Sequence, residues 1–354
     1  MNNIKTRQVI KLMINSTPPL LSARNLSIEF QADTQHIQAV SNVSFDMFPG
    51  EILGLVGESG SGKSVTAMSI LRLIPMPPGL IKSGCIEYCG QDLLKMPVNA
   101  LRKIRGNRIS MIFQEPMSSL SPLHRIGYQL VEQQQFHQKI DKKSAWEQAE
   151  YQLQRVGIPD VDERMYNYPF QLSGGLQQRV MIAMAFLMQP DIIIADEPTT
   201  ALDVTIQAQI FDCISEMKTK QTAILMITHD MGVVWNMCDR MMVMYASKIV
   251  EQGPVKEIFQ KPAHPYTKGL LASIPSLTDK SEKLSVIPGQ VPDMAKLPDG
   301  CAFFKRCPYG TTLCQEKQPE LIETGQNRQS ACFMAEKFMN DKTFLKKKYR
   351  SWPF

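Results

Sequence analysis

A glycine-rich loop between two apolar segments is the feature that most constrains the fold of this chain. Residues 51–74 read EILGLVGESGSGKSVTAMSILRLI, where the run before the loop predicts a strand and the spacing after it predicts a helix. Residues 57–64 match the pattern GxxxxGK[ST], whose glycines let backbone N–H groups surround phosphate. We therefore predict that this phosphate loop places Lys63 on the β and γ phosphates of a nucleotide and Ser64 on Mg²⁺. The expected binding residues are Gly57, Ser59, Gly60, Ser61, Gly62, Lys63, Ser64 and Val65.

Three further apolar runs end in polar residues. ISMIF precedes Gln114, IIIA precedes Asp196 and Glu197, and AILMIT precedes His229. Such runs are typical of a parallel sheet covered on both faces, and those sheets bind ligands at the carboxyl ends of their strands. We expect Asp196 to bind Mg²⁺ and Glu197 to orient or deprotonate an attacking water. His229 could contact the γ-phosphate, and Gln114 could contact Mg²⁺ or the water.

A second glycine element opens another predicted helix. In FQLSGGLQQRVMIAMAFLMQPD the helix begins at Ser173, Gly174 and Gly175, so its free N–H groups and dipole could bind an anion. A plain helix cap by Ser173 explains the same letters, and the spacing leaves both readings open.

Composition narrows the class of protein. Residues 1–20 contain no visible signal peptide, and the longest apolar run, residues 180–188, has nine residues, half of the roughly 18 that a spanning helix needs. We therefore expect a chain that does not cross a membrane by itself. The formal net charge of +5 is slight for 354 residues, so nucleic acid is not an expected partner.

Four of the eight cysteines gather near the carboxyl end. Cys301, Cys307, Cys314 and Cys332 lie within 32 residues. Without an export signal we expect a reducing compartment, where clustered thiols more often bind metal than form disulfides. Four thiolates suit zinc or a [4Fe–4S] cluster, and the spacing by itself leaves the metal open. The other four cysteines are scattered and are expected to be packing residues.

Taken in order, these motifs resemble those of the ATP-binding subunits of ABC transporters. The chain carries Walker A GESGSGKS, the Q-loop Gln114, the signature LSGGLQQ, Walker B IIIAD with Glu197, the D-loop ALD ending at Asp203, and the H-loop His229. The resemblance implies an α/β fold: a RecA-like P-loop core, an antiparallel β-subdomain and a helical subdomain. A cysteine-containing C-terminal extension would follow.

The resemblance divides the chain into four parts. These are a polar N-terminal tail at 1–20, the ATPase domain at 21–265 with its helical subdomain at about 115–190, the extension at 266–338, and a basic tail at 339–354. In this family ATP lies between two domains arranged head to tail, so Ser173 and Gly175 would contact the γ-phosphate in the partner's site. Phe30 is the candidate for stacking on adenine, although a buried strand residue is an equal reading.

One branch of the family matches more closely. MIFQEPMSSLSP, HPYTKGLL and the pattern CxFxxRCPxxxxxC resemble the D-type ATPase subunit of dipeptide and oligopeptide importers. This branch favours a [4Fe–4S] cluster over Zn²⁺ at the four cysteines. It implies a second ATPase subunit in a heterodimer, two membrane permease subunits and an extracytoplasmic peptide-binding protein. The chain would then lie at the cytoplasmic face of the inner membrane as a peripheral ATPase.

Other functions fit parts of the sequence. Related importers carry nickel, antimicrobial peptides or glutathione, and one chain does not identify the cargo. Soluble ABC ATPases that act on nucleic acid or ribosomes usually carry two cassettes, whereas this chain has one. A regulatory partner that binds ATP without hydrolysing it is disfavoured by the intact Glu197 and His229.

Overall fold

A computed structural model describes residues 18–32, 35–115, 119–200, 203–274, 286–325 and 327–340. Nearly all of the expected N-terminal tail, the basic tail from residue 341 onward and Ala201 of the D-loop lie outside these residues. Among the described segments, no helix is both long enough and apolar enough to span a bilayer.

The main sheet has eight strands in the order β11-β12-β10-β9-β3-β8-β7-β6. Its parallel strands are β3 (Ile52–Val56), β6 (Ile109–Ile112), β7 (Ile192–Asp196), β8 (Ala223–Ile227) and β9 (Arg240–Tyr245). Every residue of β3, β6, β7 and β8 is buried, which confirms the predicted parallel sheet covered on both faces. Alternate residues supply two separate apolar cores, one on each face.

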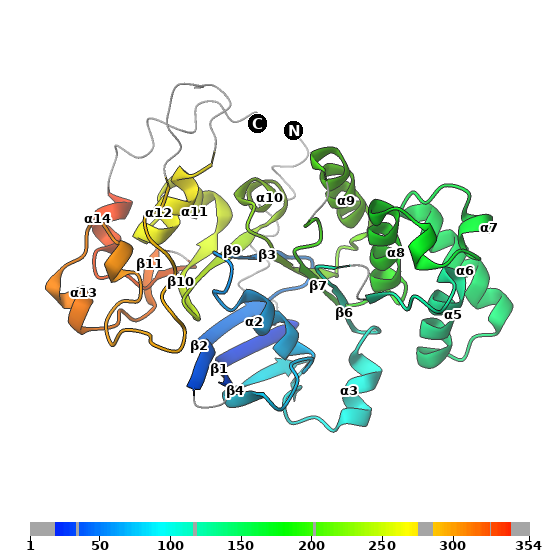
Figure 1. Ribbon diagram of the computed structural model, residues 1–354, viewed down its shortest axis with the longest axis horizontal. Helices are drawn as coiled ribbons and strands as arrows, with labels where there is room; N and C mark the ends of the chain where they lie inside the picture. The colour runs from blue at the N-terminus through cyan, green and yellow to red at the C-terminus, as the bar shows by residue number, and fades with distance from the viewer. Residues whose placement is uncertain are drawn as a thin grey trace.

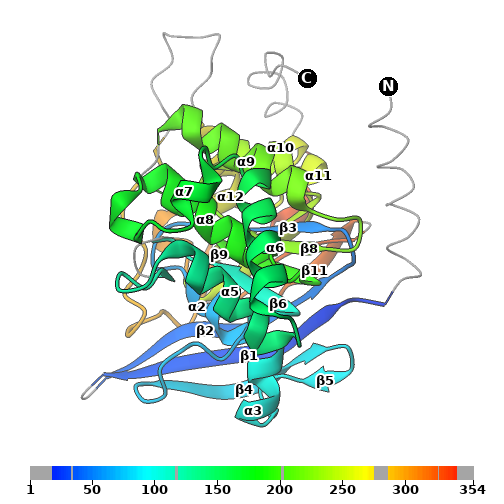
Figure 2. The same cartoon turned by 90° about the vertical axis from the view of Figure 1, so that its right-hand side faces the viewer.

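An antiparallel layer covers one face of this sheet. It comprises β1 (Leu21–Ala32), β2 (Gln35–Met47), β4 (Gly79–Tyr88) and β5 (Gln91–Asp92), in the order β2-β1-β4-β5. Figures 1 and 2 show it in blue to cyan below the main sheet, with helices α2 (Lys63–Ile70) and α3 (Val98–Ile104) beside it. Apolar side chains of this layer share one core with β3, β6, β7 and β8.

Helices cover the other face. The helical subdomain, on the right in Figure 1, contains α5 (Ile126–His137), α6 (Lys142–Arg155), α7 (Val161–Arg164) and α8 (Gly174–Phe186). The helices α9 (Val204–Met217), α10 (Met231–Met237), α11 (Val255–Gln260) and α12 (Pro265–Ala272) follow. The apolar residues of α8 pack with β6 and β7, so the subdomain is anchored to the strands that carry the polar residues.

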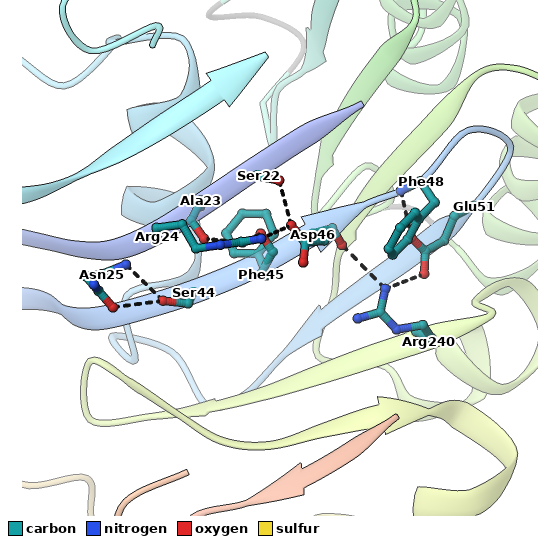
Figure 3. A network of polar contacts seen from close by, with 10 residues as sticks. All are labelled: Ser22, Ala23, Arg24, Asn25, Ser44, Phe45, Asp46, Phe48, Glu51 and Arg240. Atoms are coloured by element: carbon teal, nitrogen blue, oxygen red, sulfur yellow. Dashed lines mark hydrogen bonds and ion pairs between the residues drawn. The ribbon is translucent and has the colours of Figure 1, made fainter. Parts of the chain in front are cut away.

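A polar network fixes the antiparallel layer to the main sheet (Figure 3). The guanidinium of Arg240 on β9 lies 2.8 Å from Glu51, which immediately precedes β3, and the side chains are only 16% and 2% exposed. Glu51 also accepts a 3.0 Å hydrogen bond from the backbone N–H of Phe48. Burial raises the pKa of Glu51, and the positive charge of Arg240 opposes that rise. Arg240 also donates to the carbonyl of Asp46 on β2 at 3.4 Å, so it ties β9 to the antiparallel layer and to the segment that precedes β3.

The sequence predicted a C-terminal extension at residues 266–338, and the name extension is used from here on for residues 286–340, which follow α12 and a gap in the described chain. Strand β10 (Lys248–Pro254) pairs with β12 (Arg328–Ser330), and β12 pairs with β11 (Ile322–Gly325), so the extension adds two strands to the main sheet. Its other regular elements are η2 (Phe304–Arg306), α13 (Thr312–Glu316) and α14 (Ala335–Met339). Strands β11 and β12 of the extension therefore belong to the central sheet, on the side opposite the helical subdomain (Figure 1).

Candidate nucleotide site

The phosphate loop connects β3 to α2 and passes very close to neighbouring backbone. A Cβ atom at Gly57 would overlap the carbonyl oxygen of Met244, and one at Gly62 would overlap that of Ala39. Gly62 also has φ of 106°, which disfavours L side chains. These two glycines are therefore required by the close packing of the loop against neighbouring backbone.

Lys63 is held inside this loop. Its ammonium donates hydrogen bonds to the carbonyl oxygens of Gly57 at 2.8 Å and Glu58 at 2.9 Å. Burial lowers the pKa of Lys63, and the charges of Glu197, Asp196 and Glu58 oppose that change. The buried hydroxyl of Ser61 has no hydrogen-bond partner among the described residues. The loop thus contains the Lys63 ammonium and a Ser61 hydroxyl without a partner, two groups that could both bind a phosphate.

Ser64 and Asp196 meet although they are far apart in sequence. The Ser64 hydroxyl donates to Asp196 Oδ1 at 3.1 Å, because α2 begins beside the end of β7. Burial raises the pKa of Asp196, whereas the hydrogen bond from Ser64 and the charge of Lys63 lower it. A hydroxyl and a carboxylate are oxygen ligands of the kind that Mg²⁺ prefers, so this pair fits the expected metal.

Glu197 and His229 form a second pair at the same sheet edge. Glu197 Oε2 lies 3.4 Å from His229 Nδ1 and accepts a 3.0 Å hydrogen bond from the Thr200 hydroxyl. Glu197 has a φ of 44°, and its backbone N–H donates to the carbonyl of Ile227 on β8 at 3.0 Å. A glutamate held in this uncommon conformation by a neighbouring strand is characteristic of functional sites. The side chains of His229 and Thr200 therefore orient the Glu197 carboxylate.

The structure brings some of the predicted site residues together and leaves others apart. Lys63, Ser64, Asp196, Glu197 and His229 converge at the carboxyl ends of β3, β7 and β8. Gln114 follows β6 at the same edge and is exposed, with no hydrogen bond to that group within the described chain.

The remaining predicted residues lie apart from this group. Phe30 is half-buried on β1, opposite Gly79 of β4, where it packs against the antiparallel layer. Ser173 caps α8 through a long 3.4 Å hydrogen bond from the N–H of Leu176, and Asp203 caps α9 through the N–H groups of Thr205 and Ile206. Ser173, Gly174 and Asp203 are exposed, as are Ser59 and Gly60 of the phosphate loop. In the single chain, Ser173 therefore acts as a helix cap.

Sequence patterns did not predict the contacts that Arg306 and Tyr266 make with the phosphate loop. Arg306 of η2 lies 2.9 Å from the Glu58 carboxylate, and the Tyr266 hydroxyl accepts a 2.8 Å hydrogen bond from the Glu58 N–H. These partners are 248 and 208 residues apart, so no local motif could signal them.

The four late cysteines line one cavity with Phe303, Phe304 and His264, and its volume is about 20 Å³. Burial raises the pKa of the Cys301 and Cys307 thiols, and it raises that of Cys332 to about 12. In the part of the chain that the structure describes, no three His, Cys, Asp or Glu side chains are arranged as metal ligands. The four cysteine side chains therefore surround one small cavity.

Two family profiles match the chain. The profile described as "ABC transporter" matches residues 40–200, and "Oligopeptide/dipeptide transporter, C-terminal region" matches residues 250–314. A "Probable peptide ABC transporter ATP-binding protein" of Sinorhizobium fredii is 45% identical over 91% of this chain and 96% of its own length. A "Putative peptide import ATP-binding protein" of Brucella melitensis is 46% identical over 90% and 97%.

Solved structures also resemble this chain. A dimeric ATP-binding cassette in a post-hydrolysis state, bound to ADP and Pi, has a TM-score of 0.60 and 25% identity, covering 66% of this chain and 98% of its own. A cassette from a Clostridium perfringens ABC transporter complex has a TM-score of 0.56 and 25% identity, with coverages of 68% and 90%. These matches confirm the predicted α/β cassette fold.

Proposed function

Because this chain belongs to the ABC transporter family and is an ABC-type ATPase, we propose that it drives the import of dipeptides or oligopeptides across the cytoplasmic membrane. The observation that carries the proposal is the convergence of Lys63, Ser64–Asp196 and Glu197–His229 in a chain whose C-terminal part matches the oligopeptide/dipeptide transporter region. The relatives named as peptide transporters support the same class of cargo.

We assign the catalytic roles from the positions of the side chains. Lys63 would exchange its two carbonyl acceptors for phosphate oxygens, with the loop N–H groups around it. Glu197 would orient and deprotonate the attacking water, and His229 would hold Glu197 and contact the γ-phosphate. Mg²⁺, when bound by Ser64 and Asp196, would neutralise charge on the phosphates, with Gln114 as a further contact. The half-buried ring of Phe30 is the proposed adenine contact.

A second ATPase subunit would complete the site. Ser173, Gly174 and Asp203 are exposed at helix starts, where they could meet a nucleotide held by another chain. Head-to-tail pairing would place Ser173 and Gly175 on the partner's γ-phosphate, and the importer branch suggests a heterodimer. A lone chain would then hydrolyse ATP slowly, and adding the correct partner would raise kcat without changing the site residues.

An apolar cavity offers a contact for the membrane subunits. It measures about 230 Å³ and lies between the end of α2, strand β6 and helices α5 and α8. Its walls include Leu71, Leu73, Met111, Phe113, Leu120, Met181 and Met184. We infer that a short helix of a permease subunit docks there, one residue from Gln114, so that movement at the nucleotide reaches the membrane. The chain would therefore be peripheral, at the cytoplasmic face, in an importer with two permeases and an extracytoplasmic peptide-binding protein.

The four cysteines are the proposed ligands of a [4Fe–4S] cluster, with Zn²⁺ as the alternative. Their shared cavity and the matched branch pattern support the proposal. Iron and acid-labile sulfide would be measured on anaerobically purified protein, with a Cys301→Ser, Cys332→Ser variant as control. About four irons and four sulfides per chain, lost in the control, are expected. One zinc would select the alternative, and neither element would remove the site.

The transport proposal is tested with the assembled importer in vesicles. Labelled dipeptide should accumulate only when ATP is present on the side of this chain, and Glu197→Gln should abolish uptake while ATP still binds. Nickel and glutathione are offered as competing cargoes. A complex that hydrolyses ATP and accumulates nickel but no peptide would contradict the proposed cargo while leaving the ATPase intact.

A further inference from the structure

We propose that Arg306 of the C-terminal extension is a positioning residue for the phosphate loop, acting through the charge of Glu58 to keep the loop receptive to ATP. The inference rests on ATP binding by that loop. The observation behind it is a direct ion pair: Arg306 Nη1 lies 2.9 Å from Glu58 Oε2. The extension therefore reaches into the ATP site from the side opposite the helical subdomain.

The guanidinium is held in place by the extension itself. Arg306 Nε donates to the carbonyl of Pro288 at 2.9 Å, and Nη2 donates to that of Ile287 at 3.4 Å. The Arg306 side chain is only 6% exposed, while that of Glu58 is 29% exposed. Two backbone acceptors fix the plane of the guanidinium, and Nη1 then reaches both the Glu58 carboxylate at 2.9 Å and the Tyr245 hydroxyl at 3.5 Å.

A second contact fixes the backbone of the same loop residue. The buried Tyr266 hydroxyl accepts from the Glu58 N–H at 2.8 Å. Phe303 of the extension packs on Tyr266 and Tyr245, with ring centroids 5.5 and 5.2 Å apart. Docking of the extension therefore orders both the main chain and the side chain of Glu58.

The charge of Glu58 matters because this residue lies next to the Lys63 ammonium. The Lys63 ammonium, which is the proposed phosphate ligand, donates a 2.9 Å hydrogen bond to the carbonyl oxygen of Glu58. A carboxylate without a partner at this position would attract that ammonium and repel phosphate. Arg306 neutralises the carboxylate and holds it against the extension, which leaves Lys63 available for the nucleotide.

The test is a titration of the purified full chain with a fluorescent ATP analogue and Mg²⁺, together with thermal unfolding. Arg306→Gln should weaken nucleotide binding about five- to tenfold, the range of an ordinary coupling between two sites. Adding Glu58→Gln in the same chain should restore binding to within about twofold of the wild type, because the unpaired charge is gone. Lys305→Gln is the matched control, since it removes a positive charge from an exposed position of the same 3₁₀ helix.

The outcomes separate three cases. Unchanged binding by Arg306→Gln, or a loss that Glu58→Gln does not restore, would overturn the inference and leave Arg306 as a packing residue. If Arg306→Gln fails to fold, Glu58→Gln is compared with the double variant. A further loss of affinity in the double variant would overturn the inference, because Arg306 would then act by another route. A wild-type chain that binds no nucleotide would instead contradict the ATPase assignment.

Discussion

The nucleotide site and the C-terminal extension are held together in different ways. The site is made by residues that directly follow buried strands, so the regular sheet places Asp196, Glu197 and His229 at one edge. The extension is joined to the core by a short strand pairing and by long-range side-chain contacts, among them the ion pairs Arg306–Glu58 and Arg328–Glu251. Changes at the site should therefore alter chemistry with little effect on folding, whereas changes at the docking contacts should alter folding first.

The largest expected effect is on the chemistry of Glu197. Glu197→Gln keeps the shape of the side chain and its contact with Thr200 but removes the proposed base, so kcat should fall about a thousandfold. ATPase rate and nucleotide affinity would be measured on the same protein. Binding should stay within about threefold and the unfolding midpoint within a few degrees.

The matched control for this prediction is Glu216→Gln, an exposed glutamate near the end of α9. It should leave kcat unchanged. A Glu197→Gln chain that still hydrolyses ATP at a tenth of the wild-type rate would show that another group activates the water. Changes at the site would then affect the chemistry less than expected.

The docking of the extension should fail when Glu251 is changed. Its carboxylate is completely buried, lies 2.7 Å from Arg328 and accepts the backbone N–H groups of Ala263 and His264. Glu251→Gln leaves the Arg328 charge buried without its partner, which should cost about 3–5 kcal/mol of unfolding free energy. The thermal midpoint should fall by roughly 5 °C.

Glu323→Gln is the control for Glu251, because it removes a carboxylate from the same extension at an exposed position of β11. Its midpoint should change by no more than about 2 °C. Equal midpoints for the two variants would mean that strand pairing and aromatic packing hold the extension without the buried ion pair.

The free energy of unfolding should depend on pH because of His264, which lies in the same docking region. Complete burial lowers the pKa of His264 to about 3, and its Nδ1 accepts the N–H of Tyr266 at 3.1 Å, so the folded chain holds it neutral. An unfolded histidine titrates near 6.5, so between about pH 6.5 and 3 the unfolded chain binds more protons. Stability should therefore fall as the pH falls, by about 1.4 kcal/mol between pH 7.5 and 5.5.

Chemical denaturation at those two pH values measures this effect. His264→Gln should lose that part of the pH dependence, whereas His124→Gln, at an exposed position, should keep it. A wild-type chain whose unfolding free energy is the same at both values would show that His264 is protonated in the folded state or that other groups compensate for it.

The sequence predicted the site better than the docking of the extension, for a physical reason. Strand periodicity, the glycine loop and the rule on strand ends are local signals, and they predict that Lys63, Asp196, Glu197 and His229 lie at one edge of the sheet, where the structure has them. The ion pairs Arg306–Glu58 and Arg328–Glu251 join positions 248 and 77 residues apart, and nothing near either partner distinguishes it from a surface charge. For the same reason the short strand β12, three residues long, was not foreseen.

The smallest effect on the folded chain is expected at Ser173. Its hydroxyl accepts a long 3.4 Å hydrogen bond at an exposed helix start, so Ser173→Ala should reduce the unfolding free energy by only about 0.5 kcal/mol. If the hydroxyl contacts the partner's nucleotide, the ATPase rate of the assembled pair should nevertheless fall at least tenfold. Asp203→Ala removes a stronger cap from α9, with hydrogen bonds of 3.1 and 3.0 Å, so it should reduce the unfolding free energy by more than Ser173→Ala does. Both caps belong to the proposed partner-facing surface. If Ser173→Ala lowers the unfolding free energy but leaves the ATPase rate of the assembled pair unchanged, Ser173 is an ordinary helix cap.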